Sequence, residues 1–474
     1  MTLPTMDARG AVRVIATMAF VLAAAAIAVH APGQVSMDTS VQLHEASIGR
    51  SISWNPPFMS ALLRWLGGGE LATAALVFFN SVLVYGSFVV VAASVAEARV
   101  AAGLPRIAAW RGVLAGVLLL NPIVMIYVGI VWKDVLFGAL VTAGCACGVA
   151  AGFGSRFRRW SYAALSVVLL AATLLARQQG IFMAPVLLLL PLISLSRDGR
   201  LVRPGLAALG LVCFAIAVFG LQAAVDRSIR GADGRSTSVG YRSIMIFDAA
   251  GIVSRSPRTA AEFAHPINAA QLAAVRSVYD PSRIDYLARA PLAEGWLGAH
   301  SNEALRQAWW SLVRQDPANY IGHRATAFAT LLGLRGVAVT LPVHIGVDGN
   351  LAYLEALGMS ARRDARDLFV YRVASSFFGW PVYRHFYWLL LLAGAAVVIA
   401  VTRLPGRLRA SACVVILATA LLYLSFLPTM ISSDFRYLFA AIPLVTIVWL
   451  ILLLGAGRRS VAIATATTPI PPAP

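Results

Sequence analysis

The chain has 474 residues, of which 59% are hydrophobic and only 13% are charged. A soluble domain carries about 25% charged residues because its surface must be hydrated, so a string of soluble domains is excluded. The net charge of +18 is typical of nucleic-acid-binding proteins. Here, however, the arginines stand in short clusters between apolar runs, which indicates an integral membrane protein and argues against a nucleic-acid partner.

Ten apolar stretches predict membrane helices, each of which needs about 20 mostly apolar residues. In chain order they cover residues 11–30, 71–96, 110–128, 131–152, 161–176, 181–196, 205–225, 386–401, 411–430 and 438–454. The predicted fold class is therefore an all-α polytopic membrane protein with about ten transmembrane helices. All four cysteines lie inside these stretches, which argues against disulfides and redox motifs.

Arginine clusters predict the orientation of the chain in the membrane. They lie at residues 9–13, 99–111, 156–159, 197–203, 403–409 and 458–459. All six lie on one side if the N-terminus is cytoplasmic, as the positive-inside rule requires. The C-terminus is then cytoplasmic too, with a disordered Thr/Pro/Ala-rich tail at 457–474. A cleaved signal peptide ending near Val29-His30-Ala31 is an alternative for the first span and leaves the remaining topology unchanged.

Two segments outside the predicted spans are long, and this orientation places both on the periplasmic face. The first, residues 31–69, belongs to an N-terminal membrane region covering 1–225. The second, residues 226–385, is a domain-sized insertion before the three C-terminal transmembrane helices of region 386–456. This periplasmic domain is predicted to be mostly helical.

Within the insertion, capping residues mark two consecutive helices. Asn302 is predicted to cap a helix that runs to Arg314, and Asp316-Pro317 ends it and starts the next one. Both helices mix aromatic residues with arginine, which is typical of helices that lie on a bilayer surface.

Charged residues beside membrane spans are costly, so each is a functional candidate. Asp38 follows the first span, and a helix there would place Asp38, Gln42 and Glu45 on one face. A carboxylate at this position can act as general base toward a hydroxyl of a sugar acceptor, with Glu45 as the nearest second carboxylate. The alternative is that Asp38 only caps the loop helix.

The only lysine of the chain, Lys133, opens the fourth span beside Asp134. A compact ammonium suits a phosphate oxygen, and Asp134 can orient that lysine or the acceptor. The alternative is an interfacial Lys133–Asp134 ion pair with Trp132 as a belt aromatic.

Two arginines stand in very short external loops. Arg177 breaks the inside-positive pattern, and its planar guanidinium can bind phosphate through two hydrogen bonds; the alternative is that it reaches toward lipid headgroups. Arg436 follows Asp434, and the alternative is that Asp434 or Ser433 caps the last span with Arg436 as a salt-bridge partner. The candidate substrate-binding residues beside these charges are His44, Trp54, Trp132, Gln178 and Tyr437.

These motifs resemble the polyprenyl-phosphate-sugar-dependent glycosyltransferases of the GT-C superfamily, the group of protein O-mannosyltransferases and lipid A aminoarabinose transferase. The resembling features are Asp38 soon after the first span, Trp54-Asn55-Pro56-Pro57, Trp132-Lys133-Asp134, Arg177-Gln178-Gln179-Gly180 and Asp434-Phe435-Arg436-Tyr437. In the insertion, Phe247-Asp248 and Asp316-Pro317-Ala318-Asn319-Tyr320 resemble related bacterial proteins loosely.

The resemblance implies inverting transfer of a sugar from a lipid phosphate on the external face. Asp38 would be the base, and Arg177 and Arg436 would hold the donor phosphate. Asp134 and Glu45 are the other candidate catalytic residues, and Lys133 is a further candidate for binding the phosphate. The external domain would cover the acceptor. Asp38 departs from the family pattern because no second acidic residue adjoins it, so the sequence predicts no metal and no other cofactor.

The sequence therefore predicts a glycosyltransferase of the bacterial inner membrane with an undecaprenyl-phosphate-linked sugar donor and an envelope lipid or glycan acceptor. One alternative is an O-antigen polymerase or ligase, which would place its essential residues in the large insertion, at His323 and Arg324. Another is a flippase or transporter of lipid-linked sugars. That class expects charges near the bilayer midplane, whereas the charges here gather at one face.

Overall fold

The computed structural model describes residues 4–196, 204–231, 235–258, 262–263, 266–292 and 301–457. Over these ranges the elements that the loops connect are helices, apart from two short antiparallel strands, β1 (Thr5–Asp7) and β2 (Arg106–Ala108). The predicted all-α polytopic fold class is confirmed. The arginine clusters at 197–203 and 458–459 lie outside the described residues. The predicted disordered tail also lies outside them from residue 458 onward.

Eight helical stretches of the described chain are long and apolar enough to cross a membrane. They are α1 (Ala8–His30), α4 (Gly69–Ala101), α5 with α6 (Ala109–Leu118 and Pro122–Tyr127), α7 (Lys133–Ala150), α8 (Arg156–Ala176), α11 (Pro204–Ser228), α20 (Gly406–Thr429) and η5 with α21 (Phe435–Leu438 and Ala441–Gly455). Shorter apolar helices are α9 (Gly180–Leu187), α10 (Leu189–Leu195) and α19 (His385–Val401). These helices occupy the ten stretches that the sequence predicts.

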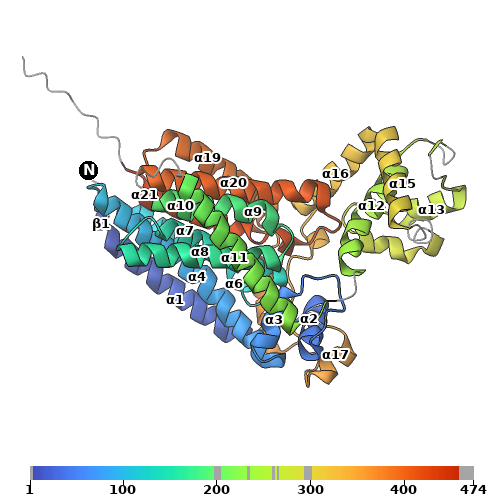
Figure 1. Ribbon diagram of the computed structural model, residues 1–474, viewed down its shortest axis with the longest axis horizontal. Coiled ribbons are helices and arrows are strands. Elements are labelled where there is room, and N and C mark those ends of the chain that lie inside the picture. The colour runs from blue at the N-terminus through green and yellow to red at the C-terminus, as the bar shows by residue number, and fades with distance from the viewer. Residues whose placement is uncertain are drawn as a thin grey trace, which may run out of the picture.

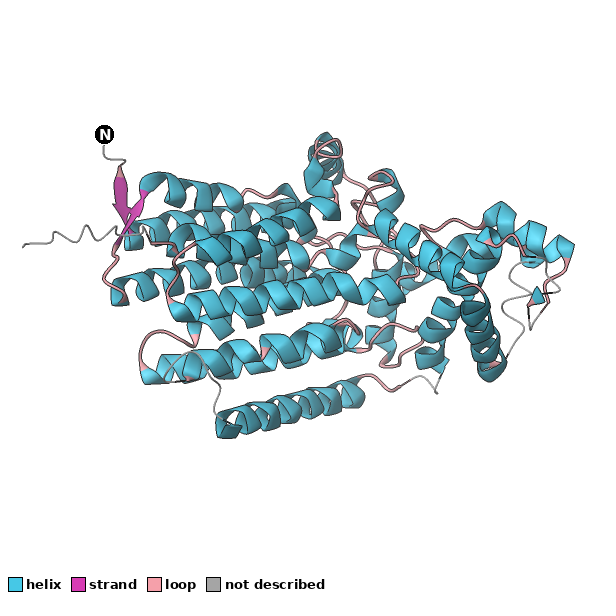
Figure 2. Cartoon of the chain, turned by 90° about the horizontal axis from the view of Figure 1, so that it is seen from above, coloured by secondary structure: helices cyan, strands magenta, loops and turns pink. Residues whose placement is uncertain are grey.

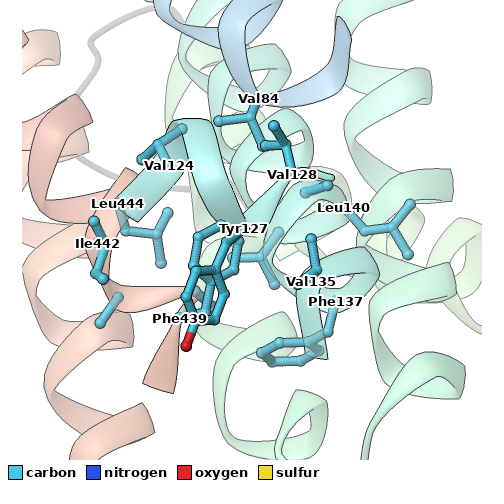
Figure 3. Packing of buried hydrophobic residues seen from close by; sticks show 14 of the residues in the cluster. Val84, Val124, Tyr127, Val128, Val135, Phe137, Leu140, Phe439, Ile442 and Leu444 are labelled. Atoms are coloured by element: carbon cyan, nitrogen blue, oxygen red, sulfur yellow. The ribbon is translucent and has the colours of Figure 1, made fainter. Parts of the chain in front are cut away.

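The centre of the bundle is formed by α7 and the last span. In each, 94% of the apolar stretch is buried, against 22% in α1 and 11% in α11. Gly138 of α7 lets the last span approach closely, since a Cβ there would lie 2.8 Å from the Phe439 ring. Figure 3 shows Phe439 beside Tyr127, and their rings stack at 5.1 Å between centroids. Such close packing holds membrane helices together, because lipid tails are as apolar as the side chains.

Both ends of the described chain lie at the same end of the bundle (Figure 1). There Arg99 Nη1 donates hydrogen bonds to the carbonyls of Gly455 and Ala456, at 3.2 and 3.0 Å, and Arg111 Nη1 donates to Ala456 at 2.7 Å. The side of the membrane that this end faces stays a prediction from the arginine clusters.

The opposite end of the bundle carries the two long segments between the spans, as Figure 2 also shows. The first segment forms α2 (Met37–Ile48) and α3 (Phe58–Trp65). The second divides into two parts. Its first part contains α12 (Arg235–Arg255), α13 (Ala269–Val278), η2 (Ile284–Arg289), α15 (Asn302–Gln315) and α16 (Pro317–Leu331), which enclose an apolar core of their own. We call this part the external domain.

The second part of the insertion packs on the end of the bundle. It contains η3 (Ala338–Thr340), α17 (Leu351–Ala356), α18 (Ala365–Ser376) and η4 (Pro381–Tyr383). Helix α17 contacts α2, and α18 contacts α1 and α6. A buried hydrogen bond from Tyr127 Oη to the carbonyl of Pro342, 2.7 Å long, anchors this part to the bundle.

Helix boundaries in the external domain follow the predicted capping residues with one correction. Ser301, not Asn302, caps α15, because Ser301 Oγ accepts from the Ala304 amide at 3.2 Å while the Asn302 side chain accepts from Arg242 at 2.8 Å. Asp316 caps α16 as predicted, accepting from the Asn319 amide at 3.3 Å, with Pro317 in the first turn.

Candidate active site

Charged residues from separate segments meet at the end of the bundle that carries the external domain. Asp38 comes from α2, Lys133 and Asp134 begin α7, and Arg177 follows α8. Asp434 precedes the last span, and Arg436 lies in its first turn, η5. We call these six residues the charged cluster. Salt bridges connect five of them directly, namely Asp38, Asp134, Arg177, Asp434 and Arg436.

Arg436 is the residue that all three carboxylates of the cluster share. Its Nη2 lies 2.7 Å from Asp38 Oδ2 and 3.2 Å from Asp434 Oδ2, and its Nε lies 3.7 Å from Asp134 Oδ2. The guanidinium also stacks over the Trp132 ring, 4.6 Å from its centroid, a favourable cation–π contact. Arg436 is therefore more than the local salt-bridge partner of Asp434.

Arg177 and Asp134 form a buried ion pair through Arg177 Nη1 and Asp134 Oδ1. Their side chains are 7% and 1% exposed. Gln179 Oε1 accepts a hydrogen bond from Arg177 Nε at 2.7 Å, and the Tyr437 ring lies 4.6 Å from the guanidinium carbon. Arg177 therefore points into the protein and does not reach toward lipid headgroups.

Lys133 is held differently from the arginines. Its ammonium donates a hydrogen bond to Asn55 Oδ1 and lies 5.5 Å from the centroid of the Trp54 ring. Among the described residues it makes no salt bridge, and the alternative of an ion pair with Asp134 is not seen, because Asp134 faces Arg177 and Arg436. Two of the three protons of the ammonium can thus serve another acceptor.

Asp38 lies in the first turn of α2, and its side chain is 40% exposed. The N-cap residue of this helix is Ser36, so Asp38 is not the cap. Burial acts to raise the pKa of Asp38, but the positive charges of Arg436 and Lys133 outweigh it and lower the pKa below its ordinary value. Asp38 is therefore an accessible, ionised carboxylate at neutral pH.

This lowered pKa predicts how the stability of the fold depends on pH. The Asp38–Arg436 pair stabilises the folded protein above the ordinary pKa of 3.8, and the contribution is lost as the pH falls through the lower folded value. We therefore expect the difference in thermal midpoint between the wild type and Asp38→Asn to be larger at about pH 6 than at about pH 2 to 3. Thermal unfolding in detergent at both pH values measures this difference, and a difference that does not change with pH would contradict it.

Glu45 lies on the same helix as Asp38 but does not join the charged cluster. Its buried carboxylate accepts hydrogen bonds from the amides of Ile52 and Ser53, both at 2.8 Å, and from Ser60 Oγ at 2.6 Å. The same side chain thereby ties the end of α2 to the turn that leads into α3. The geometry gives Glu45 a positioning role for this turn.

We expect Glu45→Gln to lower the thermal stability of the protein, because an amide cannot accept all the hydrogen bonds that the carboxylate accepts. The cost is about 1–3 kcal/mol for a buried group left without its partner. The measurement is the thermal midpoint in detergent, with Glu355→Gln, an exposed residue of α17, as the control. Loss of lipid-phosphate binding in the folded fraction of Glu45→Gln would place Glu45 in the site after all.

The predicted substrate-binding residues fall into two groups. Trp132, Trp54 and Tyr437 lie against the cations of the charged cluster, and Trp132 Nε1 donates to Ser36 Oγ at 2.8 Å. His44 instead stacks on Tyr353 of α17, with 4.0 Å between ring centroids. Gln178 is exposed, and its neighbour Gln179 makes the hydrogen bond to Arg177.

The structure adds residues to the site that sequence reasoning missed. The salt bridge of Asp434 with Arg436 is among the alternatives that the sequence offers, but its second salt bridge, with Arg283, is not. Asn55 belongs to a motif that the sequence showed, but its role as acceptor for Lys133 had no local signal. Arg283 comes from the external domain and had no signal at all, because its contact depends on how that domain sits on the bundle.

A second group of polar residues is buried inside the external domain. Asp248 Oδ1 lies 2.6 Å from Arg324 Nε and 3.2 Å from His323 Nε2, and its Oδ2 accepts from Trp309 Nε1 at 2.9 Å. Tyr279 Oη lies 2.6 Å from His323 Nδ1. Burial lowers the pKa of His323, although Asp248 acts in the opposite direction, so this histidine is neutral at pH 7. We call these five residues the buried external cluster.

No protein-family model matches the chain, and no characterised protein matches it in sequence. The crystal structure of ArnT from Cupriavidus metallidurans in the apo state is similar over 94% of this chain and 78% of that chain, with 15% identity and a TM-score of 0.31. ArnT is a lipid A aminoarabinose transferase of the GT-C group that the sequence motifs resemble.

Proposed function

We propose that the protein is a membrane glycosyltransferase that moves a sugar from a polyprenyl-phosphate donor to an envelope lipid or glycan acceptor. The observation that supports this function is the charged cluster itself. At the end of a membrane bundle, Asp38 is a half-exposed and ionised carboxylate that pairs with Arg436 and feels the charge of Lys133. A third cation, Arg177, is connected to Arg436 through Asp134, and all three cations can bind phosphate. A phosphate-linked sugar and an acceptor hydroxyl need this combination of groups.

In the proposed reaction, the acceptor hydroxyl oxygen attacks the anomeric carbon and its proton passes to Asp38. The bond between that carbon and the phosphate oxygen breaks, and the phosphate leaves with the electron pair, so the configuration at the sugar inverts. Lys133, Arg177 and Arg436 stabilise the negative charge that develops on the phosphate. Because Arg436 now pairs with Asp38 at 2.7 Å, a bound phosphate that attracts Arg436 also frees the base.

The lipid-linked donor follows from the proposed location of the site. The arginine clusters predict that this end of the bundle faces the periplasm of the bacterial inner membrane. Nucleotide sugars are made and kept in the cytoplasm, so an activated sugar must reach this face already attached to a lipid such as undecaprenyl phosphate. The independence from metal ions that the sequence predicts stays a prediction.

The alternative of a polymerase or ligase depends on His323 and Arg324 of the buried external cluster. These side chains are 0% and 5% exposed, and both contact Asp248. Both residues pair with a carboxylate of their own domain, and Arg324 also donates to the carbonyl of Met430, which supports a structural role for this pair. A transporter is also less well supported, because the charged cluster lies at the end of the spans and not at their midpoints.

Mass spectrometry of envelope glycolipids tests the proposed function. Membranes from cells with the wild-type protein, without it, and with Asp38→Asn should be compared. We expect one glycolipid or glycan to lose the mass of one sugar in the last two samples, with the unmodified acceptor accumulating. Identical profiles in all three samples would contradict the proposal and favour a different activity.

A further inference from the structure

One residue of the external domain reaches the charged cluster of the bundle. Arg283 lies between α13 and η2, and its Nη2 forms a salt bridge with Asp434 Oδ1. Its side chain is only 17% exposed. A second carboxylate, Asp285, lies 3.5 Å from Arg283 Nη1, but that side chain is 70% exposed, so water and salt screen its charge.

Backbone hydrogen bonds fix the position of Arg283. The Ser433 amide donates to the carbonyl of Ser282 at 2.8 Å, and the Ile284 amide donates to the carbonyl of Ile431 at 2.9 Å. These bonds form an antiparallel bridge in which Arg283 pairs with Ser432. The backbone on both sides of Arg283 is thus hydrogen-bonded to the loop before the last span, and this holds the Arg283 side chain beside the charged cluster.

The buried external cluster strengthens the same junction. Arg324, which pairs with Asp248, also donates from Nη1 to the carbonyl of Met430 at 2.7 Å. The external domain therefore contacts three consecutive parts of the segment 430–434, through a buried side chain, a backbone bridge and the Arg283–Asp434 salt bridge. That segment leads directly into Arg436.

The count of charges sets Arg283 apart from other arginines of the external domain. The charged cluster contains three carboxylates and three cations, so its formal charges cancel. Arg283 is a fourth cation at the same place, and four cations less three carboxylates leave a formal charge of +1. A partly buried site with excess positive charge favours an anionic ligand.

Arg283 and Arg436 already hold two oxygens of one carboxylate. Arg283 contacts Asp434 Oδ1, and Arg436 contacts Asp434 Oδ2 at 3.2 Å. Guanidinium groups match carboxylate and phosphate oxygens with the same planar geometry. Two arginines so arranged, from different parts of the fold, can therefore hold a phosphate in the same way.

We propose that Arg283 is a further substrate-binding residue, which together with Arg436 binds the phosphate of the lipid-linked donor in exchange for Asp434. This inference rests on the proposed function and adds a component to it. The external domain then completes the donor site itself, in addition to covering the acceptor. The bound phosphate then joins Arg283 of the external domain to Arg436 of the bundle in place of Asp434.

Direct binding of farnesyl phosphate to the purified full-length protein in detergent tests this proposal. Isothermal titration calorimetry should show affinity about 10- to 100-fold weaker for Arg283→Ala, the range expected for a hydrogen bond to a charged group. Arg283→Lys should retain part of the affinity.

Arg289→Ala is the matched control, because this exposed arginine of the same turn stacks on Tyr286 at 4.0 Å and makes no contact with the cluster. Its affinity should equal that of the wild type.

A second variant separates phosphate binding from a merely structural salt bridge. Asp434→Asn removes the carboxylate that competes with the phosphate for Arg283 and Arg436. We expect this variant to bind farnesyl phosphate several-fold more tightly than the wild type, and to give no such gain when Arg283 is also alanine. Weaker binding by a folded Asp434→Asn protein, as judged by size-exclusion chromatography, would assign the salt bridge to structure alone and overturn the proposal.

The remaining outcomes distinguish failure of this inference from failure of the proposed function. Unchanged affinity in Arg283→Ala, with affinity lost in Arg177→Ala, overturns the role of Arg283 and leaves the proposed function intact. A wild-type protein that does not bind farnesyl phosphate overturns both. Inorganic phosphate that binds as tightly as farnesyl phosphate would assign the site to a free anion and overturn the lipid-linked donor as its ligand.

Discussion

Asp38→Asn should abolish sugar transfer while the protein is still made, inserted and able to bind the donor. A positioned general base contributes about 10²- to 10⁴-fold to a rate, and asparagine cannot accept the proton of the acceptor hydroxyl. Arg436 keeps its contacts with Asp434 and Asp134 when Asp38 is neutral, so the donor site persists. The measurement is the transfer rate in isolated membranes at equal protein amount, together with farnesyl phosphate affinity.

Two controls make the Asp38 result specific. Asp348→Asn changes a carboxylate whose side chain is 58% exposed and whose nearest cation, Arg363, is 3.7 Å away, and it should leave the rate unchanged. Asp38→Glu should restore part of the activity, since it keeps a carboxylate at a longer reach. Wild-type activity in Asp38→Asn would remove Asp38 from the base role, and lost donor affinity in that variant would make Asp38 a binding residue instead.

Breaking the Arg177–Asp134 pair should have the largest effect on stability. Both side chains are buried, at 7% and 1% exposure, and removing one partner leaves the other charge buried without its closest counter-charge. Such changes cost about 3–5 kcal/mol. Arg177→Gln and Asp134→Asn should each lower the thermal midpoint strongly. The double variant should recover much of the loss, because a neutral amide pair buries no charge.

Function should not recover with stability in the double variant. Without the guanidinium of Arg177 the donor phosphate loses a cation, so farnesyl phosphate binding should stay weak even when the fold is restored. The exposed Arg306–Glu303 pair of α15, at 2.7 Å, is the comparison: Arg306→Gln should leave both the midpoint and the affinity unchanged. A double variant that binds farnesyl phosphate like the wild type would show that the pair is only structural.

The sequence predicts the membrane architecture well because the signal is local. Each apolar stretch is a property of about 20 consecutive residues, and the structure has helices at all ten. The sequence also indicates which charged residues share a level, since Asp38, Asp134, Arg177 and Arg436 all stand at the same ends of their spans. The sequence is less informative about which of these charged residues pair with each other. Lys133 and Asp134 are adjacent in the chain, but neighbouring residues on a helix do not face each other.

The contacts that the sequence does not predict all join distant segments. Helical spacing places Glu45 on the face of α2 that carries Asp38, yet its partners are the amides of the following turn. Asp434 and Arg283 are 151 residues apart, and their pairing depends on how the external domain docks. At the start of α15, Ser301 and Asn302 are equally good caps, and a long-range bond from Arg242 to Asn302 decides between them.

The burial of the two central spans has a consequence for the membrane in which the protein works. The spans that carry Asp134 and Arg436 have 94% of their apolar stretch buried, whereas α1 and α11 form the boundary with lipid. A change in bilayer thickness acts first on the helices that lipid touches, through tilt or local deformation. We therefore expect the distance between Asp134 and Arg436 to depend little on the thickness of the membrane. If the proposed lipid-linked donor is the substrate, its hydrocarbon chain can stay at that boundary while its headgroup enters the site.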